Sequence, residues 1–172
     1  CGDVGPGRML EPNSLVNRVI DFFTAEKQLL TGINITITAG PTQEALDPVR
    51  YISNHSSGKM GFSLAEVAQK MGANVTLISG PVKLATPQMV ERMDVCSAMD
   101  MHQASIDKLN ECDIFIACAA VADYRPAKVE PQKMKKQQGI DNLTISLIKN
   151  PDIIADIASA ENAPFCVGFA AE

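Results

Sequence analysis

Short apolar runs rich in β-branched residues alternate along this chain with longer segments of helical periodicity. The runs are INITITAG (33–40), NVTLISG (74–80), DIFIACAAVADY (113–124) and FCVGFAAE (165–172). Between them, residues 61–71 and 99–110 carry apolar side chains at helical spacing. Near-continuous apolar strands alternating with helices are typical of a doubly wound, mainly parallel sheet with helices on both faces. We therefore predict an α/β, Rossmann-like fold, in which ligands bind at the carboxyl ends of the strands.

Shorter segments complete the expected fold. A strand is predicted around residues 93–97, another in LTISLIKN (143–150), and a short helix over 151–159. Before residue 33 the pattern differs: CGDVGPGRMLEP (1–12) is rich in Gly and Pro, and a helix follows over 13–23, capped by Asn13 or Ser14. A boundary near Leu30 divides the chain into 1–30 and 31–172. Because it starts at Cys1 without Met and stops just after an apolar run, we interpret it as a segment of a longer protein.

The composition of the chain limits the classes of partner that it can bind. With 172 residues, 46% of them hydrophobic, and a formal charge of −5, the chain can bury a sizeable core but does not attract nucleic acid or anionic membranes in general. No apolar run approaches the roughly 20 residues that span a bilayer, and no leader opens the sequence, which predicts a cytoplasmic location. Five cysteines lack zinc spacing, and His55 and His102 are too far apart to suggest a pair of ligands. No protein-ligated metal is predicted.

The stretch ISNHSSGKMG (52–61) lies between a strand-like run and a helix-like run. It is not a Walker A loop, because Ser53 and Met60 stand where that loop needs Gly and Ser or Thr, and no dinucleotide fingerprint comes after the first strand. Ser56, Ser57 and Gly58 remain: two hydroxyl groups and backbone N–H groups at a helix start can hold an anion. The alternative is that a serine caps the helix and the glycine permits a turn.

The loop before this stretch is unusually polar, with Thr42, Glu44, Asp47, Arg50 and Asn54. Long polar loops are usually functional or disordered. Arg50 is suited to bind a carboxylate or phosphate through two hydrogen bonds, and Asn54 can donate to one oxygen while accepting from an amine. A solvated arginine on a loop is the alternative.

Two further segments complete the candidate site. Asp123 ends the most apolar run, at the edge where a sheet of this class binds ligands; its alternative role is that of a turn or cap residue. KVEPQKMKK (128–136) is a basic segment framed by Pro126 and Pro131, which argues against a central strand. We predict a flap whose lysines, including Lys133 and Lys136, close over a polyphosphate; a lysine-rich surface loop is the alternative.

Several motifs together resemble one family. ITAGPTQEALDPVRYISNHSSGKMG (37–61), CAAVADYRP (118–126), the K-x-K-K arm, KNPDI (149–153) and VGFAAE (167–172) closely resemble bacterial phosphopantothenoylcysteine synthetase, the second half of a bifunctional protein of coenzyme A biosynthesis. The resemblance covers residues 32–172, and the opening CGDVGPGRMLEP looks like the tail of the fused flavin-dependent phosphopantothenoylcysteine decarboxylase. Residues 1–30 would then be decarboxylase tail and linker, and 31–172 a C-terminally truncated ligase domain.

The resemblance implies a ligation in two steps. CTP activates the carboxylate of 4′-phosphopantothenate as an acyl-cytidylate, and the amine of L-cysteine then displaces CMP. Matching positions imply that Lys133 contacts the nucleotide phosphates, that Asn54 is needed to turn over the acyl-cytidylate, and that Arg50 and Ala119 contact phosphopantothenate. Asp123 matches a residue at the nucleotide and intermediate site. The remaining implied nucleotide contacts are Ser56, Ser57, Gly58, Lys136, Phe169, Ala170 and Ala171.

The resemblance also implies cofactors and an assembly. Mg²⁺ would be held through phosphates and water, and the ligase domains would form a homodimer within a higher homo-oligomer of the fused protein. FMN would serve the decarboxylase half, whose catalytic cysteine matches Cys1. The flavin-binding body of that half is missing from this segment. An alternative is a Rossmann-like module that binds a nucleotide or dinucleotide without ligating anything; pyrophosphate release that depends on phosphopantothenate distinguishes the two.

Overall fold

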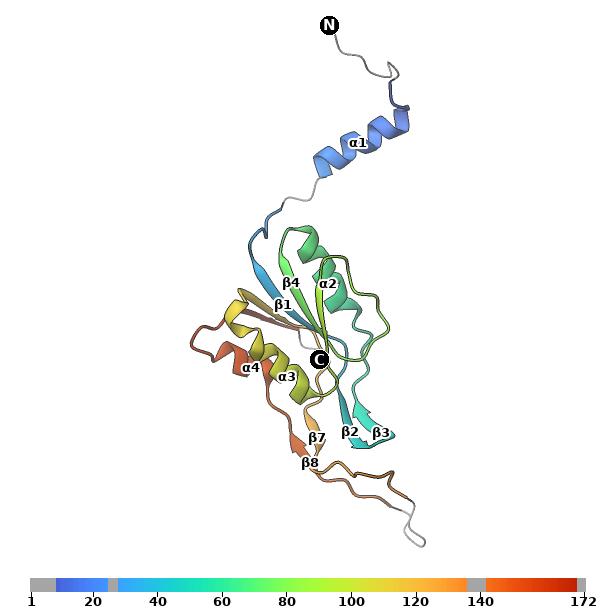
Figure 1. The fold of residues 1–172 in the computed structure, drawn as a ribbon, viewed down its shortest axis with the longest axis vertical. Coiled ribbons are helices and arrows are strands. Elements are labelled where there is room, and N and C mark those ends of the chain that lie inside the picture. The colour runs from blue at the N-terminus through green and yellow to red at the C-terminus, as the bar shows by residue number, and fades with distance from the viewer. Residues whose placement is uncertain (1–8, 25–27, 136–141, 170–172) are drawn as a thin grey trace.

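The computed structural model describes the backbone of residues 9–24, 28–135 and 142–169 (Figure 1). Its centre is a parallel sheet of five strands in the order β5 (Glu91–Asp94), β4 (Asn74–Ser79), β1 (Asn34–Ala39), β6 (Ile114–Ala117) and β9 (Phe165–Gly168). In the middle of the sheet, Ile37 lies between Leu77 of β4 and Ile116 of β6. The chain winds outward from β1 in both directions, which is the predicted doubly wound, Rossmann-like order.

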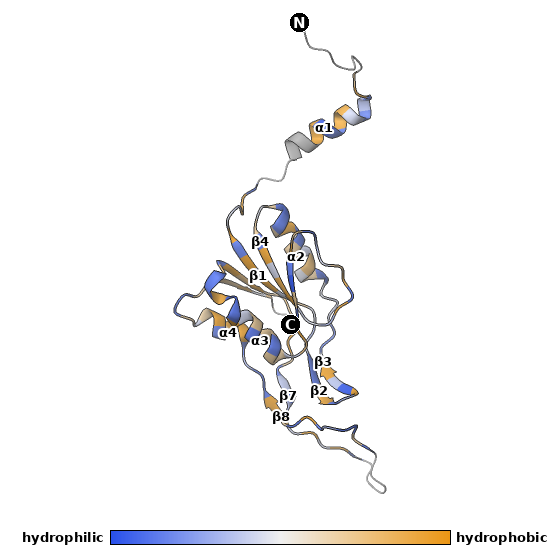
Figure 2. Ribbon diagram, in the orientation of Figure 1, coloured by the Kyte–Doolittle hydropathy of each residue, from blue (hydrophilic) through white to orange (hydrophobic). Residues whose placement is uncertain are grey.

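Helices cover both faces of the sheet, as predicted. α2 (Lys59–Lys70) packs on β1 and β4, where Ile37 and Leu77 form one core with Ala65. The other face is covered by α3 (Ala98–Asp107) and α4 (Ile153–Ala158), and there Ile78 and Phe115 form a second core. Adjacent residues of β4, Leu77 and Ile78, thus point into different cores, and Figure 2 shows hydrophobic segments in the strands at the centre of the sheet. A short 3-10 turn, η1 (Leu109–Glu111), comes after α3.

The polar stretch after β1 is not an irregular loop, as the sequence suggested, but a hairpin of β2 (Gln43–Asp47) and β3 (Arg50–Ser53). Asp47 makes the turn, because its Oδ1 accepts hydrogen bonds from the backbone N–H groups of Val49 and Arg50, both at 2.9 Å. The hairpin was missed because its residues are mostly polar and do not alternate as those of a half-buried strand do.

The expected strands 113–124 and 143–150 are also corrected. β6 stops at Ala117; the rest of the run leaves the sheet, although Ala120 still forms a bridge with Pro41. β7 (Tyr124–Pro126) and β8 (Leu147–Lys149) pair with each other in a separate antiparallel hairpin, so β8 does not extend the main sheet. All three residues of β8 are exposed, which excludes them from a buried position in that sheet.

The N-terminal helix α1 (Pro12–Thr24) covers the predicted range and precedes the α/β body in the chain (Figure 1). The expected cap is wrong, because the helix begins at Pro12 and both Asn13 and Ser14 lie within its first turn. Val16 and Val19, one turn apart, are each 54% exposed. Within the part of the chain that the structure describes, none of the helices combines the length and the apolar character required to cross a membrane.

Candidate functional site

Three loops meet where β1 and β6 end. Gly40, the residue after β1, has a φ of 77°, and its carbonyl accepts a hydrogen bond of 2.8 Å from the backbone N–H of Ala120. Gly58, with a φ of 73°, lies against it: a Cβ added to Gly58 would be 3.4 Å from the Cα of Gly40. These positive φ values favour glycine at both positions. The serine-glycine loop, the end of β1 and the segment after β6 are therefore neighbours, as expected for the carboxyl edge of the sheet.

Asn54 is tied to the segment after β6. Its Nδ2 donates to the carbonyl oxygens of Val121 at 3.0 Å and Ala120 at 3.4 Å. Its Oδ1 has no donor among the described residues. The NH₂ group of the side-chain amide thus holds Asn54 in place, and its Oδ1 can accept a hydrogen bond from a ligand.

The hydroxyl groups of Ser56 and Ser57 make only local hydrogen bonds among the described residues. Ser56 Oγ accepts from the backbone N–H of Gly58 at 3.3 Å, and Ser57 Oγ from that of Lys59 at 3.5 Å, which is too long for a strong bond. The N-cap of α2 is Gly58, and no side chain caps the helix there. The start of this 12-residue helix therefore keeps N–H groups that an anion can accept from, and neither serine is the cap.

A cavity of about 320 Å³ opens beyond the ends of β6 and β9. Three of the predicted site residues line it: Ala119, Asp123 and Phe169. The remaining wall comes from Thr38, Ala117, Val121, Ala122, Lys149, Asn150, Pro151, Asp152, Ile153, Ile154 and Gly168. The wall thus combines apolar side chains with carboxylate, amide and ammonium groups, which together could bury and orient a small molecule.

Asn150 holds the rim of this cavity. Only 5% exposed, it donates from its backbone N–H to Asp123 O at 2.8 Å and from Nδ2 to Ala122 O at 2.7 Å. Its Oδ1 accepts from Nη1 of Arg125 at 2.9 Å. No site role was predicted for Asn150 or for the adjacent Lys149. Both residues belong to KNPDI, which lies between a strand and a helix at the ligand-binding edge of the sheet. That position in the sequence could have identified them as site residues.

Arg50 and Lys133 lie away from the cavity walls. Arg50 forms an ion pair with Asp47, whose side chain has no exposed surface, and the hydrogen bonds from Arg50 hold the pKa of that carboxyl well below its usual range. Arg50 also donates from Nη2 to the carbonyl of Met134 at 3.1 Å, so the hairpin contacts the segment that carries Lys133. The exposed Lys133 has no ionic partner among the described residues.

Four of the predicted site residues, Cys1, Lys136, Ala170 and Ala171, lie outside the described residues. Within the described ranges there is no group of three or more His, Cys, Asp or Glu side chains that could hold a metal ion.

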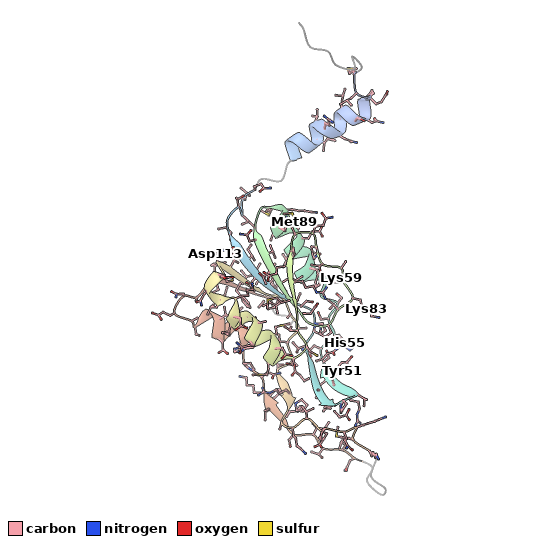
Figure 3. The ribbon with its side chains drawn as sticks, viewed as in Figure 1. Tyr51, His55, Lys59, Lys83, Met89 and Asp113 are labelled. Carbon is pink, nitrogen blue, oxygen red and sulfur yellow. The ribbon has the colours of Figure 1, made fainter. Side chains whose placement is uncertain are left out.

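A second hollow, of about 630 Å³, lies between α2 and residues 84–88, and Lys59 and Phe62 are on its wall. In Figure 3, Lys59 marks the start of α2 beside this hollow, and Tyr51 marks strand β3 of the hairpin. This hollow contains none of the predicted site residues, and it runs along the outer side of α2 instead of the carboxyl edge of the sheet. The cavity beyond β6 and β9 is therefore the better candidate.

Comparison with known proteins gives consistent matches. The family model of the DNA/pantothenate metabolism flavoprotein C-terminal domain matches residues 30–172. The coenzyme A biosynthesis bifunctional protein CoaBC of Vibrio cholerae is 60% identical over 173 residues, which cover the whole chain and 43% of that protein. The chain thus spans less than half the length of the curated relatives it matches.

Solved structures agree with the fold. The crystal structure of the C-terminal domain of a coenzyme A biosynthesis bifunctional protein CoaBC superposes with a TM-score of 0.74 and 42% identity, covering 85% of this chain and 68% of that one. A DNA/pantothenate metabolism flavoprotein from Streptococcus pneumoniae has a TM-score of 0.67 at 22% identity, covering 78% and 68%, and shows the fold alone.

Proposed function

This chain belongs to the family of the DNA/pantothenate metabolism flavoprotein C-terminal domain, and from that premise we propose that it carries the ligase activity of a bifunctional enzyme of coenzyme A biosynthesis. In the proposed reaction, a carboxylate oxygen of 4′-phosphopantothenate attacks the α-phosphorus of CTP. The bond to the bridging oxygen breaks, and pyrophosphate leaves. The amine of L-cysteine then attacks the acyl carbon of the resulting acyl-cytidylate; CMP leaves, the amine loses a proton, and phosphopantothenoylcysteine forms.

The observation that carries this proposal is the position of Asn54. Its amide is bonded to Ala120 and Val121, directly after Ala119 on the cavity wall, and its Oδ1 remains open to a ligand. An activated acyl group next to this amide could be held in the geometry that attack by an amine requires. Asp123 and Phe169 are then suited to the nucleotide side of the cavity, and Ala119 to phosphopantothenate.

The anionic parts of the substrates need cations and N–H donors. We assign the triphosphate to Ser56, Ser57, Gly58 and the uncapped start of α2, with Lys133 and Lys136 approaching as the flap closes. Arg50 would contact phosphopantothenate, and because it lies on the hairpin away from the cavity, we propose that it serves the site of a second copy in a homodimer. Mg²⁺ would enter bound to the phosphates and water, without a protein cage.

Further proposed roles belong to the parent protein. Residues 1–30 would form the decarboxylase tail and linker, with Cys1 as the catalytic cysteine of that half, and 31–172 would form most of the ligase domain. FMN would bind to the decarboxylase half, so no step of the ligation uses it. The fused protein would be cytoplasmic and assemble beyond a dimer.

The test is a pyrophosphate assay on the intact protein with Mg²⁺, with CTP and ATP offered separately. Release that requires both CTP and phosphopantothenate supports the ligase. Tight nucleotide binding without release would support the second candidate, a Rossmann-like binding module, which the cavity at the carboxyl edge of the sheet also fits. Equal release with ATP would overturn the assignment of CTP.

A pair of variants tests the division of labour. Lys133→Ala is expected to slow the first half-reaction, because a cation is removed from the departing pyrophosphate. Asn54→Asp is expected to let the acyl-cytidylate accumulate, because a carboxylate in place of the amide repels the carbonyls of Ala120 and Val121 and displaces the side chain. Equal loss of pyrophosphate release in both variants would show that these roles are wrong.

A further inference from the structure

Asp47 makes more hydrogen bonds than a hairpin turn requires. Its Oδ1 alone accepts from the backbone N–H groups of Val49 and Arg50, which is enough to form the turn. Its Oδ2 faces the other way and accepts from Nε and Nη2 of Arg50, at 3.0 and 2.5 Å, and from the backbone N–H of Met134 at 3.0 Å. The second oxygen therefore connects the hairpin to a segment that is 87 residues away in sequence.

This ion pair holds both backbone polar groups of one residue. The N–H of Met134 donates to Asp47, and the carbonyl of Met134 accepts from Arg50 Nη2 at 3.1 Å. A second backbone hydrogen bond, from Glu130 N to Leu46 O at 2.9 Å, attaches the segment four residues earlier. The segment 130–134 is thus fastened to the β2–β3 hairpin at two points, without forming a strand itself.

The residues on either side of Met134 are Lys133 and Lys135. Both are exposed, and neither has an ionic partner among the described residues. By contrast, the Asp47 side chain that holds the residue between them has no exposed surface. A buried carboxylate that serves only a surface turn would be costly, since its desolvation must be offset by bonds it makes elsewhere.

We propose that Asp47 is a positioning residue, which acts through Arg50 and the Met134 backbone to hold the lysine segment at a fixed place relative to the sheet. The inference rests on the proposed role of Lys133 at the nucleotide phosphates. Asp47 itself contacts no substrate. It limits the conformations from which Lys133 must reach the triphosphate, and so it lowers the entropic cost of bringing that cation to the reaction.

The test uses Asp47→Asn in the intact protein. The asparagine keeps an oxygen for the turn and places an NH₂ group against the donors of Arg50 and Met134. The matched control is Asp94→Asn, which removes another Arg–Asp pair, with Arg92 at 2.7 Å, from a side chain that is 70% exposed and makes no hydrogen bond or ion pair with the described residues 130–135. We expect amide exchange within 130–135, at the hydrogen-bonded N–H groups of Glu130 and Met134, to rise at least tenfold in Asp47→Asn and to stay unchanged in the control.

Activity provides the second readout. We expect Asp47→Asn to lower kcat/KM for CTP in the pyrophosphate assay by about 10-fold to 100-fold, the scale of a misplaced catalytic group. In a Lys133→Ala background the same substitution should have almost no further effect, because the residue that it positions is already gone. A purely structural role predicts that the two losses multiply.

The outcomes separate this inference from the proposed function. Unchanged amide exchange across 130–135, or losses that multiply in the double variant, would overturn the role of Asp47. If the wild-type protein releases no pyrophosphate, the ligase proposal fails, while the exchange experiment still reports whether Asp47 holds the segment. Unfolding of both variants in urea at the same midpoint as the wild type excludes a general loss of structure.

Discussion

At the scale of single residues, Asp123 and Arg50 each make a hydrogen bond with a segment that is distant in the sequence, to Asn150 and Met134 respectively. Asp123 was expected to end a strand; β6 stops earlier, at Ala117, but Asp123 does lie on the cavity wall. Arg50 was expected to be available to an anion, yet it is paired with Asp47. That pairing depends on the hairpin turn and on a backbone 84 residues away, and neither leaves a periodic signal in the sequence.

Gly61 shows how a missing side chain sets the distance between two elements. A Cβ at this position would lie 2.6 Å from the Cβ of Ala39, so α2 must move off β1 to accept it. We expect Gly61→Ala to lower the free energy of unfolding by about 1–3 kcal/mol, despite the roughly 1 kcal/mol that alanine gains over glycine in a helix.

Urea unfolding measures this change, and Ser63→Ala in the same helix is the control for helix propensity alone. A Gly61→Ala protein more stable than the wild type would mean that α2 is not held tightly against β1.

At the scale of elements, the existence of most helices and strands could be predicted from periodicity, whereas their ends and the small hairpins could not. The helix expected over 99–110 is α3 together with η1, and its start is set by side chains that helical periodicity does not indicate. Ser97 and Asp100 form a capping box, and Glu44 of β2 accepts from the backbone N–H of Ala98 at 2.9 Å. Glu44 lies 54 residues before α3, so local sequence rules could not identify it.

Glu44 is 2% exposed, and its removal would leave the Ala98 N–H buried without a partner. We expect Glu44→Ala to destabilise the protein by about 1–3 kcal/mol. Glu44→Gln retains an acceptor oxygen of the same reach and should cost less. Thermal unfolding of both variants checks this, and equal losses would show that the carboxylate charge, not the hydrogen bond, is what matters.

The cap also predicts a dependence on pH. Hydrogen bonds from Ser97 hold the pKa of Asp100 below its ordinary value of 3.8. A lowered pKa stabilises the folded state above the unfolded value and loses that contribution as pH falls through the folded value. Wild type should therefore exceed Asp100→Asn by about 1 kcal/mol at pH 6 and by less at pH 3.5. A difference in urea midpoints that is equal at both pH values would contradict this.

At the scale of the whole molecule, the doubly wound sheet could be predicted because largely apolar runs alternate with helical segments, as a parallel sheet with a core on each face requires. The β7–β8 hairpin could not, because LTISLIKN has the composition of a buried strand and only its pairing partner decides where it goes. Asn150 makes the connection between that hairpin and the sheet, through its bonds to Ala122, Asp123 and Arg125.

We expect Asn150→Ala to speed amide exchange in β7 and β8 by at least tenfold, while exchange in α2 stays unchanged, because about 1.4 kcal/mol of lost local stability gives that factor. Asn110→Ala, at an exposed asparagine, is the control. Exchange that rises equally in all elements would indicate global destabilisation and not a local release of the hairpin.

The cavity is built from residues at the ends of β1, β6 and β9, from the segment after β6, and from the connection between β8 and α4 with the start of that helix; none of its wall belongs to the core under α2. Variation in that packed interior should thus alter the yield of folded protein without changing which molecules it recognises. Variation in the connecting segments should change which molecules the protein recognises, with less effect on the yield of folded protein. A library confined to residues 119, 121, 123, 149, 151 and 152, which leaves the buried Asn150 in place, is suited to a search for altered ligand preference.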